Sequence, residues 1–323
     1  MCAPILLIFF NRPDCLEQTF NEIRKAKPEK LYLFQDGARA DKPSDDENIN
    51  KCRQIVQNID WECEVQEMFC EVNNGCGKGP FKAINWLFEN ETEGIVLEDD
   101  CIASQSFFKF CTEMLEKYRN DDRIFLITGC NMELYTQVDS SYFFGYSGTN
   151  WGWASWRRNW DKMDYECSWI ENTNIHNQLK TFLVKNDGKK GKCELESFKR
   201  ANRLIKGGTN VSYWDVQWQA IRYLNHQLSI IPSKNLITNI GLGPTSTHAV
   251  GVSIPNEYHS KAGVVNFCYN ERYDLDFPLN HPKAVIPNIE YDSKIGKALY
   301  PNLFVKIISK GKRVLKRMLN KQA

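Results

Sequence analysis

The sequence of 323 residues lacks several features that would each place it in a narrow class of proteins. None of its twelve cysteines forms a CxxC pair, and several stand singly within apolar patterns, which is typical of reduced, buried thiols. No run of 18 apolar residues occurs, so no membrane-spanning helix is expected. The formal net charge of +1 argues against bulk nucleic-acid binding, and no nucleic-acid partner is expected.

Two further absences concern targeting and metal ligands. No basic segment or cleavage site precedes Pro4, where a strand pattern begins, so we expect a cytoplasmic protein. Cys63, Cys70 and Cys76 are irregularly spaced without a histidine nearby, which disfavours a zinc site. Hydrophobic residues make up 42% of the chain and charged residues 25%, as in ordinary globular proteins with a sizeable core. At this length, one large domain or two are expected.

Strand-like and helix-like segments alternate in the first part of the chain. Apolar runs of strand length occur at residues 5–10, 31–34, 65–69, 94–97 and 124–127. Helical patterns separate them at residues 16–23, 47–58, 80–90 and 107–118. A glycine-rich loop is expected at residues 73–79, and a polar, lysine-rich mobile loop between Lys180 and Lys192. The alternation predicts an α/β fold with a mainly parallel central sheet flanked by helices on both faces.

Polar residues directly follow three of these strands. The strands lead into Asn11-Arg12, into Asp36-Gly37 and into the acidic triplet Glu98-Asp99-Asp100. Because ligands bind beyond the carboxyl ends of parallel strands, we expect the three groups to converge on one edge. Three adjacent carboxylates at the tip of a buried strand repel one another unless a cation is present. Mn²⁺ or Mg²⁺ fits, and such ions complete their shells with water and phosphate oxygens, so a diphosphate ligand is implied. A solvated acidic loop is the simpler alternative.

Four of the nine tryptophans lie between residues 151 and 160. Aromatic rings stack on the apolar faces of sugars, so Trp151, Trp153 and Trp214 are candidates for contact with a sugar or an acceptor. A packed core is the alternative, and it is the favoured interpretation for most tryptophans of this group.

These residues resemble the GT-A glycosyltransferases, and within them the N-acetylglucosaminyltransferase I group and related bacterial sugar transferases. The matching stretches are Pro4-Ile5-Leu6-Leu7-Ile8 with Asn11-Arg12, Gln35-Asp36, Val96-Leu97-Glu98-Asp99-Asp100 with Phe107-Phe108, Trp214-Asp215 with Trp218, and Thr238-Asn239-Ile240-Gly241 running to Thr247-His248. The resemblance implies a Rossmann-like GT-A domain at residues 1–250, with a nucleotide-sugar-binding half at 1–130 and an aromatic-rich acceptor-side half at 131–250. Residues 251–302 would form an extension packed on this domain.

The resemblance also implies roles for single residues at the donor site. Asp36 matches the aspartate that pairs with the uracil edge, and Arg12 matches the basic residue that approaches the diphosphate. Asp100 matches the carboxylate that binds the divalent metal directly. Glu98 and Asp99 would support it and touch the nucleotide sugar.

Three further residues are implied less directly. Asp215 matches the region of the general base in inverting members. The family pattern Trp-Asp-Asp-Trp is, however, replaced here by Trp-Asp-Val-Gln-Trp. The alternative is that Asp215 is a helix-capping or structural acid. His248 falls where the family closes a polar loop over the nucleotide, and a hydrogen-bonded loop residue is the alternative. Lys78 would add positive charge at the phosphates, but its glycine-rich surroundings lack Walker spacing, and a flexible-loop lysine is simpler.

Residues 303–323 form a basic amphipathic segment. They contain no acidic residue and seven basic ones: Lys306, Lys310, Lys312, Arg313, Lys316, Arg317 and Lys321. Such a helix can bind an anionic membrane surface, each basic residue contributing up to about 1 kcal/mol. That would place the protein peripherally on the inner face of the membrane. A solvated terminal helix packed on the domain is an equal alternative.

The sequence therefore predicts a metal-dependent transferase, a hexosyl- or N-acetylhexosaminyltransferase of polysaccharide biosynthesis. It would move a sugar from a nucleotide diphosphate donor, a UDP-sugar, to a glycan or lipid-linked acceptor with inversion. Glycosyl transfer needs a charged leaving group, a cation to neutralise it and a carboxylate base. A nucleotidyltransferase would instead favour a glycine- and lysine-rich stretch after the first strand, where the chain reads Asn11-Arg12-Pro13. A non-catalytic glycan-binding module is the third reading.

Overall fold

The computed structural model describes residues 2–241 and 271–300. The elements that form the central part of the fold are β1 (Ile5–Phe9), α1 (Pro13–Ala26), β2 (Lys30–Gln35), α2 (Ser44–Val56), β3 (Glu64–Phe69), α3 (Gly75–Asn90), β4 (Glu93–Glu98), β5 (Cys101–Ala103), α4 (Gln105–Lys117) and β6 (Ile124–Thr128). The elements that follow are β7 (Tyr142–Gly145), β8 (Trp153–Trp156), α5 (Arg157–Trp160), the 3₁₀-helix η1 (Ser168–Glu171), α6 (Thr173–Lys206), α7 (Asp215–Leu224), β9 (Leu228–Pro232), β10 (Ile237–Asn239) and α9 (Ile289–Leu299).

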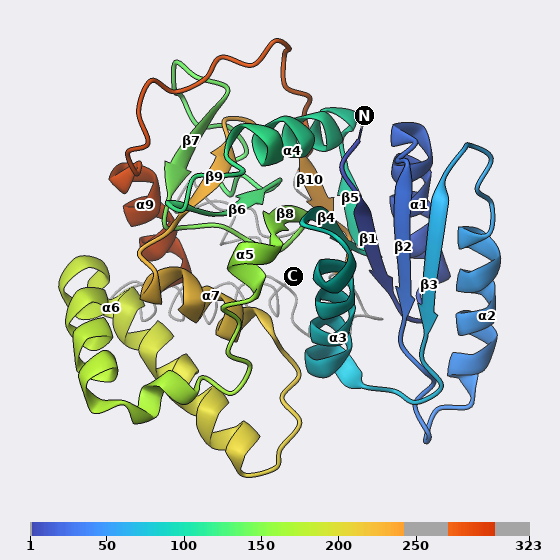
Figure 1. Ribbon diagram of the computed structural model, residues 1–323, viewed down its shortest axis with the longest axis horizontal. Helices are drawn as coiled ribbons and strands as arrows, with labels where there is room; N and C mark the ends of the chain where they lie inside the picture. Colours follow the sequence, from blue (N-terminus) through green and yellow to red (C-terminus); the bar gives the residue numbers. More distant parts are fainter. Residues whose placement is uncertain (1, 242–270, 301–323) are drawn as a thin grey trace, which may run out of the picture.

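One eight-stranded sheet, in the order β3-β2-β1-β4-β8-β6-β9-β7, forms the centre of the molecule (Figure 1). Strands β3, β2, β1 and β4 pair in parallel, and β9 pairs in parallel with β6. Only β8 and β7 are antiparallel to the strands beside them. The predicted α/β class, with a mainly parallel central sheet flanked by helices, is confirmed.

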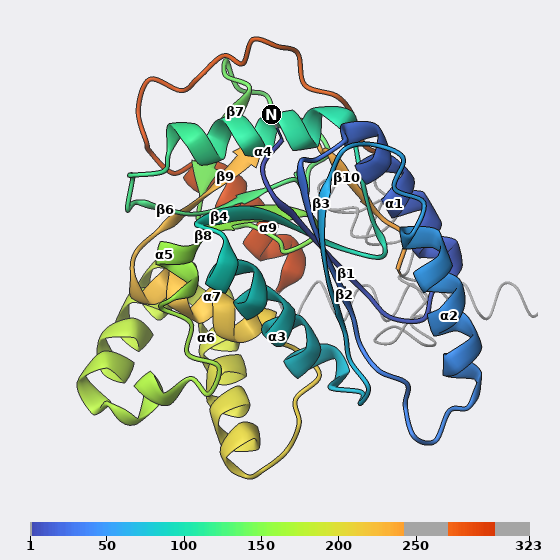
Figure 2. The ribbon, with the colours of Figure 1, turned by 45° about the vertical axis from the view of Figure 1, so that its right-hand side comes forward.

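Helices cover both faces of this sheet because successive strand residues point to opposite sides. In β1, Ile5 and Leu7 face a core cluster that also contains side chains of α1 and α4, whereas Leu6 and Ile8 face a second cluster with side chains of α3 and α7. Figure 2 shows α4 and α3 on opposite sides of the strands. The strands are therefore buried on both faces, which explains their continuous apolar runs.

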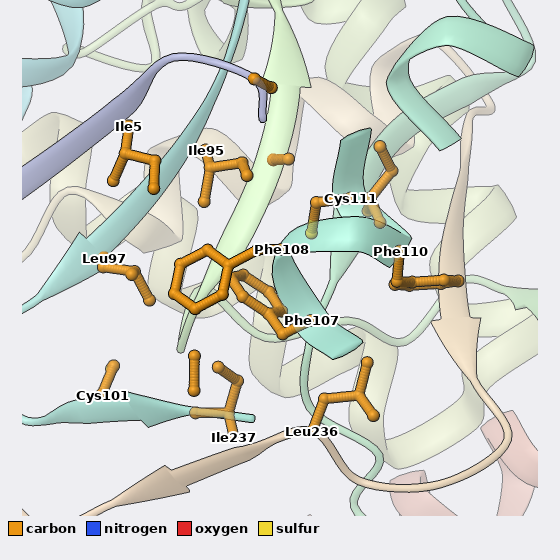
Figure 3. Packing of buried hydrophobic residues seen from close by; sticks show 14 of the residues in the cluster. Ile5, Ile95, Leu97, Cys101, Phe107, Phe108, Phe110, Cys111, Leu236 and Ile237 are labelled. Carbon is orange, nitrogen blue, oxygen red and sulfur yellow. The ribbon is translucent and has the colours of Figure 1, made fainter. Parts of the chain in front are cut away.

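Helix α4 contributes the aromatic part of the first cluster. Phe107 and Phe108 lie beside Ile5, Ile95 and Leu97 of the adjacent strands (Figure 3). Both phenylalanines are buried, and their rings meet edge-on with centroids 5.4 Å apart. This packing fixes the end of β4 and the short strand β5, which carry the acidic triplet between them.

Two expectations for loops are wrong. Residues 180–192 lie inside α6, where apolar side chains at helical spacing, Leu179, Leu183, Leu195 and Phe198, pack in a third core cluster. That packing outweighs the lysine-rich composition, and Gly188, with φ of 52°, supplies the non-helical break within the helix. The glycine-rich stretch is not a loop either, because α3 already begins at Gly75.

The predicted division into parts stays a prediction. Strand β8, from the proposed acceptor-side half, lies between β4 and β6, so the two halves share one sheet. Residues 271–300 pack on the sheet through α9, where Tyr291 and Ile295 join a cluster with Phe143 and Ile231. The predicted basic helix at 303–323 lies outside the described residues. Within the described ranges, no helix combines the length and apolar character needed to cross a bilayer.

Candidate functional site

The carboxyl ends of β1, β2 and β4 lie side by side. Phe9 pairs with Gln35, and Ile8 pairs with Glu98, so the residues that follow each strand emerge at the same edge of the sheet. The structure thus brings together Arg12 and the acidic triplet, as the pattern of strands predicts. We call this region the carboxyl edge, defined by residues 10–12, 36–37 and 98–100.

Arg12 and Asp100 form an ion pair at this edge. The Arg12 Nη1 atom lies 2.9 Å from Asp100 Oδ2, and each side chain is 15% exposed. The Phe10 backbone N–H donates to Asp99 Oδ2 over 3.3 Å. Arg12 Nε is buried and has no acceptor among the described residues. One guanidinium therefore faces the acidic triplet and is itself not fully hydrogen-bonded.

The two remaining carboxylates of the triplet are electrostatically disfavoured in their charged forms. Burial, followed by the charges of Asp100, Asp99 and Asp215, raises the pKa of Glu98 well above its ordinary range. Burial and the neighbouring Asp100 raise the pKa of Asp99 to about 7, although Arg12 acts in the opposite direction. Negative charge thus exceeds positive charge here, which is the condition that a bound cation relieves.

This donor set fits a hard divalent cation. It offers carboxylate oxygens, which Mn²⁺ and Mg²⁺ prefer, together with the unmatched donor Arg12 Nε for an accompanying anion. Among the described residues, no group of three or more histidine, cysteine, aspartate or glutamate side chains is arranged to hold a metal ion. A cation at Asp100 would therefore depend on water and substrate oxygens for most of its shell.

A strand from elsewhere in the chain holds Asp100 from the opposite side. Asn239 of β10 donates through Nδ2 to Asp100 Oδ1 over 3.2 Å, and the Ile240 N–H donates to the Asp100 backbone oxygen over 2.9 Å. Gly241 lies so close that a Cβ there would overlap the Asp100 carboxylate. Residues 238–241 are among the stretches that match the family, but nothing in the sequence indicates that they contact residue 100.

Asp36 lies at the carboxyl edge but is already bonded there. Its carboxylate accepts hydrogen bonds from the backbone N–H groups of Gly37, Asn74 and Gly75 and from Asn74 Nδ2, over 2.8–3.1 Å. The side chain thus binds the beginning of α3, where a negative charge also suits the helix dipole. Its acceptor positions are largely used, so this geometry favours a structural role over pairing with uracil.

Lys78 is exposed on the first turn of α3, away from any hydrogen-bond partner that the structure shows. The glycines around it have a packing reason. A Cβ on Gly77 would overlap the backbone oxygen of Val211, and one on Gly79 would lie 3.3 Å from Asp36 Oδ2. Close approach of the chain therefore explains this stretch without a bound phosphate.

The candidate base Asp215 is exposed and is the first residue of α7. Its charge raises the pKa of Glu98, which places it within electrostatic reach of the carboxyl edge. The preceding Trp214 is only 4% exposed and Trp153 only 1% exposed, and their ring centroids lie 5.8 Å apart. Neither ring offers a face to a sugar. Both tryptophans therefore belong to the packed core, which was the alternative interpretation. Trp151 is half-buried.

The last predicted donor-site residue, His248, lies outside the described residues. The cysteines that the structure describes form no disulfide with one another, and each is buried or half-buried. A separate hollow of about 730 Å³ lies at the amino ends of the strands, lined by residues that include Lys30, Glu93 and Arg119. It is at the opposite end of the strands from the acidic triplet.

No protein-family model matches the chain, and no curated protein matches it. Among solved structures, it is similar to a galactosyltransferase, LgtC, in complex with donor and acceptor sugar analogues, with 10% identity and a TM-score of 0.33 over 53% of this chain and 65% of that one. HddC from Yersinia pseudotuberculosis has 10% identity and a TM-score of 0.31, over 48% of this chain and 77% of that one. A UDP-glucose pyrophosphorylase complexed with UDP-glucose has 12% identity and a TM-score of 0.26, over 45% and 62%. The chain spans 65% of the length of the first of these proteins, and we base the function on its own residues.

Proposed function

We propose that the chain is a glycosyltransferase that moves a sugar from a nucleotide diphosphate donor, a UDP-sugar, to a hydroxyl group of a glycan or lipid-linked acceptor. The carboxyl edge carries this proposal, because three adjacent carboxylates lie there with one partly unsatisfied guanidinium. The closer assignment to the N-acetylglucosaminyltransferase I group, and to hexosyl or N-acetylhexosaminyl transfer, is part of the same proposal.

The donor would bind between Arg12 and the acidic triplet. Asp100, with Glu98 and Asp99 beside it, would hold Mn²⁺ or Mg²⁺, which supplies a Lewis acid for the charge of the departing diphosphate. Arg12 would donate to the diphosphate oxygens, and its unmatched Nε supports this role. Asp36 would fix the beginning of α3 beside the donor; its contact with uracil remains a prediction, as do the roles of Lys78 and His248.

The acceptor would approach from the side of α7. A carboxylate oxygen of Asp215 would take the proton of the attacking hydroxyl, and attack opposite to the leaving diphosphate would invert the anomeric centre. The exposed position of Asp215 and its electrostatic effect on Glu98 support this assignment. Trp151, the half-buried member of the predicted tryptophans, remains the candidate for stacking on a sugar.

The connection between β1 and α1 favours a transferase over a nucleotidyltransferase. It consists of residues 10–12 alone, and the helix begins directly at Pro13. This short connection contains no glycine and leaves no room for a glycine- and lysine-rich phosphate loop after the first strand.

Calorimetric titration of UDP with and without Mn²⁺ tests the proposal. We expect Mn²⁺-dependent binding in the wild-type protein and at least about 100-fold weaker binding in Asp100→Asn, which keeps the size of the side chain but removes its charge. Asp276→Asn is the matched control, because that side chain is 98% exposed. Absence of UDP binding with any metal ion would contradict the UDP donor, and binding without turnover of any UDP-sugar would leave a glycan- or nucleotide-binding module.

A further inference from the structure

The guanidinium of Arg12 is only partly hydrogen-bonded. Its Nη1 atom is committed to Asp100 Oδ2 at 2.9 Å, while its Nε is buried without an acceptor among the described residues. An unmatched buried donor is costly, and a guanidinium is best satisfied by an anion that offers several oxygens in one plane. A diphosphate can offer such oxygens, whereas the single contact with Asp100 does not use the whole fork.

Asp100 is held in place without Arg12. Asn239 Nδ2 donates to its Oδ1 over 3.2 Å, and the Ile240 N–H donates to its backbone oxygen over 2.9 Å. These contacts leave Oδ2, the oxygen bonded to Arg12, as the position where a second cation can compete. A divalent cation bound to this oxygen would repel the positive guanidinium at close range, so the two cations compete for it.

We propose that Arg12 is an exchangeable counter-cation, which pairs with Asp100 Oδ2 in the present arrangement and transfers to the donor diphosphate when a divalent cation takes that oxygen. The inference rests on the proposed function, because the diphosphate is the second partner of Arg12. Asn239 acts as a positioning residue that keeps Asp100 in place during the exchange. Metal and nucleotide diphosphate binding are then coupled, and the coupling is reciprocal.

Arg12→Gln separates exchange from a simple effect of charge. Removing Arg12 frees Oδ2, so Mn²⁺ alone binds about tenfold more tightly. When UDP is saturating, the diphosphate already draws Arg12 away from Oδ2 in the wild-type protein, so the same substitution changes Mn²⁺ affinity by less than about twofold. A field effect of the lost charge would tighten Mn²⁺ binding equally with and without UDP. Calorimetric titration of Mn²⁺, with and without UDP, measures both arms.

Arg24→Gln is the matched control, since it removes the same charge from the last turn of α1, the helix that Arg12 precedes, but breaks an exposed ion pair with Asp60. It leaves both Mn²⁺ affinities unchanged. Equal tightening of Mn²⁺ binding in both arms of Arg12→Gln, or no tightening without UDP, overturns the exchange. Failure of wild-type protein to bind UDP with Mn²⁺ is a different result, which contradicts the donor and not the competition for Oδ2.

A measurement on the wild-type protein covers the case in which Arg12→Gln does not fold. The NMR signal of the Arg12 Nε–H group in ¹⁵N-labelled protein reports directly on the unmatched donor. Exchange predicts that the signal moves downfield when Mg²⁺ and UDP are added together, because Nε gains a phosphate acceptor. An unchanged signal at saturating Mg²⁺ and UDP overturns the proposal.

Discussion

The two ends of the parallel strands differ in how their charges are balanced. The hollow at the amino ends is lined by four basic residues and four glutamates, and Arg119 pairs with Glu93 there over 2.9 Å. At the carboxyl edge, the triplet at residues 98–100 faces Arg12, and the pKa of Asp99 rises to about 7, with burial the largest cause. Unbalanced buried charge therefore lies at the carboxyl edge, whereas charges of both signs line the hollow.

The largest effect on folding is expected at Asp36, whose carboxylate receives the N–H groups at the beginning of α3. Asp36→Asn turns one acceptor into a donor that faces other donors, and should lower the free energy of unfolding by about 1–3 kcal/mol in urea titrations. Asp60→Asn, which affects an exposed ion pair, should change it far less. Unchanged stability together with lost UDP binding would instead support the predicted contact with uracil.

Asp99→Asn tests the charge imbalance directly. Its raised pKa means that the folded protein disfavours the charged carboxylate, so stability falls as pH rises from about 4 to about 7. The variant should gain about 1 kcal/mol of unfolding free energy at pH 8, gain nothing below pH 4, and bind Mn²⁺ more weakly. Thermal and chemical unfolding at both pH values would show this difference.

The corresponding substitution at the amino ends of the strands should lower stability, whereas Asp99→Asn should raise it. Glu93→Gln breaks a pair with Arg119, whose side chain is 46% exposed, and should lower stability by less than about 1 kcal/mol at pH 8. If both variants lose stability equally, the two ends of the strands do not differ as we infer.

A further modest effect concerns Asp45, a balanced carboxylate near the carboxyl edge. Hydrogen bonds from Arg39 lower its pKa, and Asn11 adds another bond over 2.6 Å. Its stabilisation is present above about pH 4 and is lost as pH falls through the lowered pKa. We expect a loss of about 1 kcal/mol on acidification below pH 4, and Asp45→Asn should remove that pH dependence in urea titrations. If the loss of stability below pH 4 persists unchanged in this variant, Asp45 is not its cause.

The sequence predicted those parts of the fold and site that depend on local pattern. Continuous apolar runs identified the strands, and the rule that parallel strands present ligands at their carboxyl ends brought Arg12 and Asp100 to one edge, where they form an ion pair. The composition of residues 180–192 was misleading, because lysines, most of them exposed, conceal a buried face of α6 formed by residues such as Leu183 and Leu195.

The remaining features depend on contacts between distant residues, which no single sequence displays. Asp36 bonds residues 74 and 75, and Asn239 bonds a residue 139 positions earlier. The tryptophans show the same limit. Their number indicated a special region, but only the packing of Trp153 and Trp214 against one another reveals that both belong to the core.

The close approach at Gly77 has a consequence for engineering. Gly77 lies in the first turn of α3, against the backbone of Val211, which is four residues before Asp215. Chimeras that exchange the segment around residues 205–215 for one of different shape would press on the first turn of α3, and through it on Asp36, 3.3 Å from a Cβ at Gly79. This segment could then not be exchanged as an independent module, because the graft would need a matching first turn of α3.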